Sequence, residues 1–90
     1  MGIKIVIPSV LRPFTNNMEV VEVKGSSVSG CLDHLVKQFP DIEKRLFAEN
    51  DELNSYVGIY VNGENAYAEG LAKPVEDGDE LHIVYIVDGG

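Results

Sequence analysis

The chain has no tryptophan, only one cysteine, and no apolar run long enough to cross a bilayer. A single cysteine cannot form an internal disulfide, which fits a reducing compartment. A membrane-spanning helix needs roughly 18 or more apolar residues, and the opening MGIKIVIP lacks the regions of a signal peptide. We therefore expect a cytoplasmic protein with no membrane partner and a core of aliphatic, Phe and Tyr side chains.

Basic residues are scarce as well. Seven Lys and Arg stand against 15 Asp and Glu, which gives a net charge of -8. Phosphate recognition depends on clustered Lys and Arg, so no nucleic-acid partner is expected. The acidic residues are spread through the chain, as is typical of a solvated surface, although an acidic face that attracts a basic enzyme stays open as an alternative. The length of 90 residues predicts one domain, residues 1–90.

The first half of the chain predicts two strands and two helices. Apolar residues alternate in IKIVIP, with Ile3, Ile5 and Ile7 on one face. MEVVEVKG predicts a second strand, joined to the first by the turn-forming connection SVLRPFTNN. A helix follows, closed by Pro40, whose apolar stripe is Val28, Cys31, Leu32, Leu35, Val36 and Phe39. A cap from Ser26 or Ser27 begins this helix, and a short second helix is predicted from residue 41.

The second half predicts the remaining strands. YVGIYV reads as a strand that ends in an Asn62-Gly63 turn, and a brief pairing segment with loops is expected in AYAEGLAKPVEDGDE. In the last strand, ELHIVYIV, one face carries Leu81, Ile83, Tyr85 and Val87 and the other carries His82, Val84 and Ile86. The order of elements predicts an α+β fold, with a mixed sheet of four to five strands packed on one main helix plus a short second helix.

One helix can cover only one face of such a sheet. Apolar residues on the other face would then be exposed, namely Val6, Tyr60, Val84 and Ile86. An exposed apolar patch often marks a docking surface. The alternative is that Leu11 and Phe14 of the first connection fold over it.

Few residues suggest catalysis. Cys31 and His34 are neighbours on a helix and could be a nucleophile with its base, or two metal ligands. Cys31 continues the apolar stripe, however, and no further ligands complete a zinc site, so we interpret it as a core residue. EDGDE lacks the ligand order of a calcium loop and predicts a tight turn. We therefore expect no metal site and no enzyme.

The chain ends in YIVDGG. Two glycines carry no side chain and tolerate any backbone angle, so they form a thin lead with a carboxylate at its tip. If this carboxylate is a chemical handle, another protein must activate it, because this chain offers no nucleotide site of its own.

Four stretches together resemble the ubiquitin-like sulfur carriers of the ThiS/MoaD family: the ending GDELHIVYIVDGG, the opening IKIVIP, the helix VSGCLDHLVKQFP and the segment YVNGEN. The resemblance spans the chain in order and is most specific at DGDE and the final GG. Between residues 40 and 56 the chain matches by residue type rather than by motif. The resemblance implies the β-grasp fold, a mixed sheet wrapped round one helix.

The resemblance also implies a chemistry for the tail. In this family an E1-like adenylyltransferase (MoeB/ThiF-type) uses ATP to adenylate the terminal glycine, which a sulfur donor then converts to a thiocarboxylate. Carried over, Gly90 would be the carrier residue, and Gly89 and Asp88 would form the slender tail. Val84 and Ile86 would dock on the activating enzyme. The chain would bind no cofactor itself and would act as a co-substrate of enzymes.

Three roles stay open for a chain whose terminal glycine is activated in this way. IPSVLRPFTNN resembles the IPTPLRxxT opening of CysO-like carriers, which favours a cysteine synthase as the sulfur acceptor. A small subunit of molybdopterin synthase has the same fold and ending, with the large subunit as partner. A ubiquitin-like modifier joined through Gly90 to lysines of other proteins is the third role. An interaction module whose glycines are incidental is the alternative to all three.

Overall fold

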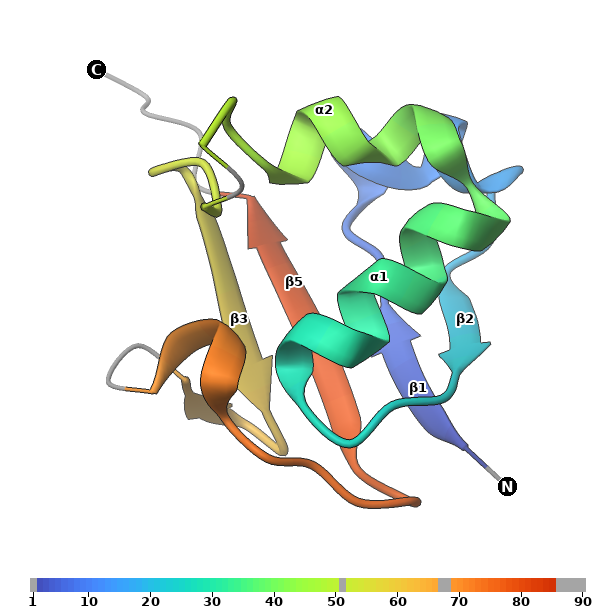
Figure 1. The fold of residues 1–90 in the computed structure, drawn as a ribbon. Coiled ribbons are helices and arrows are strands. Elements are labelled where there is room, and N and C mark those ends of the chain that lie inside the picture. Colours follow the sequence, from blue (N-terminus) through green and yellow to red (C-terminus); the bar gives the residue numbers. More distant parts are fainter. Residues whose placement is uncertain (1, 51, 67–68, 86–90) are drawn as a thin grey trace.

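The computed structural model describes residues 2–50, 52–66 and 69–85, and a five-stranded mixed sheet lies at its centre (Figure 1). The strands are β1 (Ile3–Val6), β2 (Val20–Val23), β3 (Val57–Val61), β4 (Glu64–Asn65) and β5 (Glu80–Tyr85). Their order is β2-β1-β5-β3-β4, with β1 and β5 parallel and the other neighbours antiparallel. The predicted mixed sheet is confirmed. Strands β1 and β5 take inner positions, which explains why both of their faces are apolar.

The helices cover one face of this sheet. Figure 1 shows α1 (Val28–Gln38) and α2 (Glu43–Leu46) in front of the strands. Short 3-10 helices, η1 (Ser9–Thr15), η2 (Pro40–Ile42) and η3 (Gly70–Ala72), complete the described elements. The hydroxyl of Ser27 accepts the backbone N–H of Gly30 at 3.1 Å and caps α1, and the helix ends two residues before Pro40. One main helix and a short second one were predicted, and both are confirmed.

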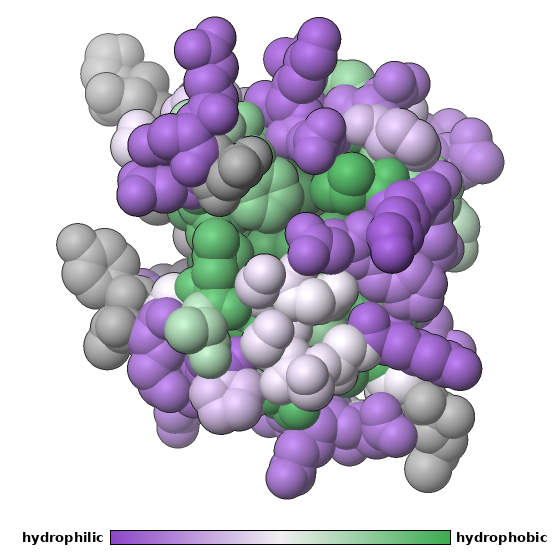
Figure 2. Space-filling model, in the orientation of Figure 1, coloured by the Kyte–Doolittle hydropathy of each residue, from purple (hydrophilic) through white to green (hydrophobic). Residues whose placement is uncertain are grey.

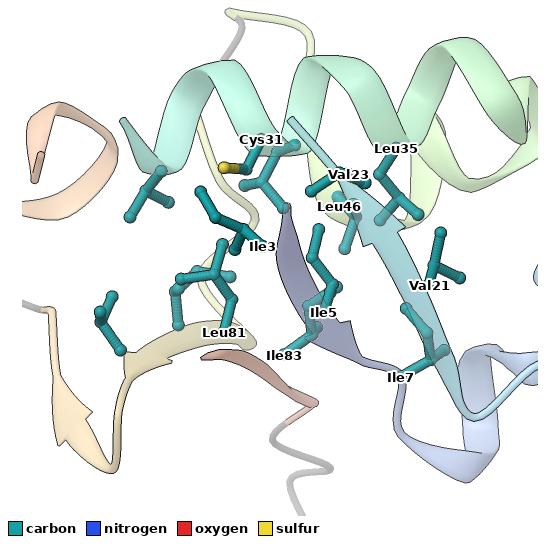
Figure 3. Packing of buried hydrophobic residues seen from close by; sticks show 14 of the residues in the cluster. Ile3, Ile5, Ile7, Val21, Val23, Cys31, Leu35, Leu46, Leu81 and Ile83 are labelled. Atoms are coloured by element: carbon teal, nitrogen blue, oxygen red, sulfur yellow. The ribbon is translucent and has the colours of Figure 1, made fainter. Parts of the chain in front are cut away.

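The core lies between the helices and the sheet. Figure 3 shows Cys31 and Leu35 of α1 and Leu46 of α2 above the isoleucines of β1 and the inward residues of β2 and β5. The fully buried side chains include Ile3, Ile5, Ile7, Val21, Val28, Leu32, Ile42 and Leu81. Each large aliphatic side chain buried in this way contributes roughly 1.5–3 kcal/mol to folding. The apolar residues that alternate along the strands and those that repeat along α1 therefore pack together in one core.

The connection between β1 and β2 is more regular than a loop. It folds as η1, followed by Asn16 and Asn17 in the left-handed region with φ of 54° and 63°. Asparagine tolerates this region, so the chain can reverse there without glycine. The hydroxyl of the fully buried Thr15 donates to the carbonyl of Met18 at 3.1 Å and fixes the end of η1.

Leu11 and Phe14 of η1 lie on the helical side of the sheet. Leu11 belongs to the same core cluster as α1, and the ring of Phe14 lies 4.8 Å beneath the guanidinium of Arg45 in α2. The alternative that they fold over the opposite sheet face is therefore wrong, because both side chains bury their apolar surface in the part of the core near α2.

The second half differs from the prediction in one place. Pairing with β3 begins at Glu64, directly after the turn and before AYAEGLAKPVEDGDE, and it reaches that segment at Ala66, whose N–H donates to the carbonyl of Ile59 at 3.0 Å. Asn62 and Gly63 have φ of 52° and 86°, and two positive φ values in a two-residue turn bring the next residues straight into register. The later part of the segment forms η3 and the Asp77-Gly78 turn. Within the described residues, no helix is long and apolar enough to span a bilayer.

Candidate functional site

The sheet face without helices carries a row of side chains from four neighbouring positions. His82 of β5 lies between Tyr60 of β3 and Val6 of β1, and Val6 pairs in turn with Val20 of β2. Val20 is 42% exposed and the other three are half-buried, outside the core cluster. We call Val6, Val20, Tyr60, His82 and Val84 the open-face patch. It is an apolar surface with one imidazole at its centre.

Val84 occupies the end of this patch nearest the tail. It pairs with Gly58 of β3 and precedes Tyr85, the last described residue. Among the residues that the structure describes, the nearest atom to a Cβ added at Gly58 is the Cβ of Val84, at 4.0 Å. The sheet surface beside Val84 is therefore flat, and another protein can reach this valine from the side.

The opposite end of the same face is charged. Lys4 of β1 lies between Glu22 of β2 and Glu80 of β5 in the strand register. Glu80 also approaches His82, with 2.6 Å between its Oε1 and the imidazole Nε2. The face thus changes from charged near the start of β5 to apolar near its end, where the chain continues into residues 86–90.

A polar network fixes the start of β5. The side-chain amide of Asn62 donates to Asp79 Oδ1 at 3.0 Å, and the backbone N–H of Glu76 donates to Oδ2 at 2.8 Å. Both bonds favour the charged form, so the pKa of Asp79 is lowered, first by Asn62 and then by Glu76. The carbonyl oxygen of the Asn62 side chain accepts the N–H of Glu80 at 2.9 Å. EDGDE is therefore a structured tight turn, as predicted.

Cys31 is a core residue, as the sequence predicted. It is fully buried, and Figure 3 shows its sulfur on the sheet side of α1. Burial raises the pKa of this thiol, and the charge of Asp79 raises it further. His34 is engaged elsewhere, since its Nδ1 accepts the backbone N–H of Lys24 at 2.8 Å. The two side chains therefore do not form a nucleophile and base, and no group of three His, Cys, Asp or Glu among the described residues is arranged for a metal.

The structure locates one of the predicted site residues. Val84 lies on the uncovered sheet face, whereas Ile86, Asp88, Gly89 and Gly90 lie outside the described residues, so their roles stay predictions. The sequence did not reveal the flat surface at Gly58. The signal that could have revealed it is Gly58 itself, because a glycine inside an apolar strand often marks a place where another backbone or a partner approaches closely.

A hollow of about 250 Å³ lies beside β3 and β4, and Gly58 belongs to its lining. The described residues that line it include no titratable side chain: Leu53, Asn54, Ser55, Val57, Gly58, Ile59, Asn65, Ala66 and Gly70. Among these residues no acid or base is present that could activate the hydroxyl of Ser55.

Comparison with known proteins identifies the family. The model of the ThiS family matches residues 5–90, which includes the terminal glycines. The chain belongs to the ThiS family. This ThiS-family protein is 32% identical over 93 residues to the sulfur carrier protein CysO of Mycobacterium tuberculosis, with all of both chains covered. It is also 37% identical over 71 residues to small archaeal modifier protein 1 of Haloferax volcanii, with 78% of each chain covered.

The fold agrees with the family. The crystal structure of the BexX/CysO complex of Amycolatopsis orientalis contains a chain that superposes with a TM-score of 0.91 at 34% identity, covering 99% of this chain and 100% of that one. The ThiS-family protein thus has the ubiquitin-like β-grasp fold that its sequence resemblance implied. The two relatives described above are named as a sulfur carrier and as a small archaeal modifier.

Proposed function

We propose that this protein carries sulfur on Gly90. An E1-like enzyme transfers AMP from ATP to the terminal carboxylate and releases pyrophosphate. A sulfur nucleophile from a donor then attacks the acyl carbon and displaces AMP, which leaves a thiocarboxylate. The thiocarboxylate sulfur then forms a bond to the acceptor substrate on a biosynthetic enzyme, and water cleaves the acyl–sulfur bond, which releases the sulfur with the product and restores the carboxylate of Gly90. In this cycle the chain is a co-substrate, and the activating enzyme consumes the ATP.

One observation carries the proposal: the family match extends through the final Gly-Gly, on a chain similar along its whole length to the sulfur carrier CysO. The same similarity favours a cysteine synthase as the acceptor. The open-face patch supports a docking role for Val84, because this valine is accessible and lies two residues before Ile86 and six before Gly90. Docking there would leave the tail free to enter an active site.

Intact-protein mass spectrometry tests the proposal. The protein is incubated with ATP, its cognate E1-like enzyme and a sulfide source. The expected product is heavier by the difference between one sulfur and one oxygen, and fragmentation assigns the change to Gly90. The chain shortened to end at Gly89 is the control and should gain no sulfur. An unchanged mass with an activator that does form the adenylate would overturn the carrier function.

A second function is favoured by the similarity to small archaeal modifier protein 1. Here the activated Gly90 forms an isopeptide bond with a lysine of another protein, and AMP leaves in the same way. Peptides from a protease that cleaves before aspartate, in which a lysine carries an Asp-Gly-Gly remnant, would support this modifier role if they come from cells that express this chain and are absent with the chain ending at Gly89.

A further inference from the structure

A groove runs between the two α-helices, on the side of the molecule away from the open-face patch. It has a volume of about 170 Å³ and is lined by Ser29, Asp33, Glu43, Phe47 and Leu71. Ser29 and Asp33 are four residues apart on α1 and share one face of it. Phe47 directly follows α2, and Leu71 belongs to η3. We call these five residues the helical groove.

The floor of the helical groove is apolar. Phe47 and Leu71 are half-buried and pack against the core cluster, so their inner sides are held while their outer sides face the groove. Figure 2 views the molecule from this side and shows pale and green atoms gathered over α1 and η3, with purple atoms around them. The floor is therefore fixed in place before any partner arrives.

Two carboxylates stand at the rim, one on each wall. Asp33 on α1 and Glu43 on α2 are both exposed. The ion pairs found among the described residues join Arg12 to Glu19, Lys73 to Glu69 and His82 to Glu80, so neither rim carboxylate takes part in one. The described residues that line the helical groove include no Lys or Arg, although Lys44 and Glu49 flank the outer side of Phe47. The rim thus presents negative charge without a cation of its own.

We propose that the helical groove binds an arginine side chain of a partner protein. The three-carbon stem of arginine would lie on Phe47 and Leu71, which match it in polarity. Its guanidinium would reach Asp33 and Glu43, and a planar cation with five donors can bond to carboxylates on two walls at once. The ring of Phe47 adds a favourable face for the same cation. Lysine offers only a point charge and is expected to bind more weakly.

This contact does not involve the open-face patch or the tail. A partner held at the helical groove could therefore stay bound while another protein handles Gly90. The proposal stands apart from the sulfur-carrier function, and either can fail without the other.

Chemical-shift mapping with two peptides tests the proposal. The full chain, labelled with nitrogen-15, is titrated at low salt with acetyl-Gly-Leu-Arg-Leu-Gly-amide and with the same peptide carrying Glu in place of Arg. The arginine peptide should shift amides of residues 29–33, 43–47 and 71 and saturate with a dissociation constant in the millimolar range. The glutamate peptide should shift none of them.

Two double variants sharpen the result. Asp33→Asn with Glu43→Gln should weaken the arginine peptide about tenfold or more, because both charge-assisted bonds are lost. Asp41→Asn with Glu52→Gln changes the net charge by the same amount at exposed sites outside the groove and should change the affinity far less. Equal effects of the two variants, shifts that map to the open-face patch, or no saturable binding of the arginine peptide would each overturn the proposal.

Discussion

The imidazole Nδ1 of His34 accepts the backbone N–H of Lys24 at 2.8 Å, and this bond closes part of the outer edge of the sheet. One turn later on α1, Nε2 of Gln38 donates to the carbonyl of Glu22 in β2 at 3.2 Å. Strand β2 is at the edge of the sheet, where free backbone groups invite another strand to pair. Two side chains of α1 thus bond to the backbone groups that an added strand would use.

We predict that His34→Ala lowers the free energy of unfolding by about 1 kcal/mol, since the N–H of Lys24 loses its partner. Urea unfolding followed by circular dichroism measures this change, and analytical ultracentrifugation should detect more self-association through β2. His82→Ala is the control, because its imidazole pairs with an exposed glutamate in a contact of little net value. An equal loss in the two variants would contradict the role of His34 at the sheet edge.

The thiol of Cys31 should react slowly with a disulfide reagent such as Ellman's reagent at neutral pH. The side chain is fully buried, and its raised pKa reduces the thiolate that would attack the reagent. The same thiol should react at the ordinary rate once urea unfolds the protein. Rapid labelling of the native protein would contradict the core assignment.

A substitution at the same position separates packing from chemistry. Cys31→Ala should lower the free energy of unfolding by about 1–2 kcal/mol, because a small cavity replaces the sulfur. The variant should still accept sulfur at Gly90 as fully as the original chain. A folded variant that no longer accepts sulfur would give Cys31 a chemical role after all.

Periodicity was sufficient to predict the main elements. The isoleucines of β1 alternate and the stripe of α1 repeats at helical spacing, so the sequence determines which faces are buried. Ser27 and Pro40 mark the ends of α1 by local chemistry alone. For the same reason Val84 could be placed on the uncovered face, since alternation along β5 opposes it to the buried Ile83.

Contacts between distant segments could not be predicted in this way. His34 bonds to Lys24, and Asn62 bonds to Asp79 and Glu80, only because the fold brings separate turns and strands together. The two walls of the helical groove meet for the same reason. Neither the spacing nor the composition of the sequence predicts these contacts. Each residue that takes part in them is of a type that is common at exposed positions.

Asn62 should control the titration of Asp79. The pKa of Asp79 lies below its ordinary value of 3.8, so the charged carboxylate stabilises the folded state above that value, and the stabilisation is lost as pH falls through the folded-state pKa. Asn62→Gly keeps the positive φ of the turn but removes the amide donor. The pKa of Asp79 should then rise towards 3.8, and stability should fall less steeply in acid.

Carbon-detected NMR of the Asp79 carboxyl group measures this pKa directly, and urea unfolding at several acidic pH values measures the stability. Glu64→Gln, in the same hairpin but without a hydrogen bond to Asp79, is the control and should leave the titration almost unchanged. An unshifted Asp79 in Asn62→Gly would show that the amide of Asn62 does not set its charge.

Docking on the activating enzyme should depend on Val84 and on the flat surface beside it. Val84→Asp places a charge in an apolar contact and should lower kcat/KM of adenylation by about thirtyfold, as expected for a contact worth about 2 kcal/mol. Gly58→Leu adds only bulk, at a position where a new Cβ has room, and should also raise KM while the fold persists.

Lys37→Glu on α1 is the control, because it changes the charge on the helical side of the molecule, and it should leave the rate of adenylation unaltered. Circular dichroism verifies that each variant is folded, and steady-state release of pyrophosphate gives the rates. Activation that survives both Val84→Asp and Gly58→Leu would exclude the open-face patch as the docking surface and direct attention to the helical side.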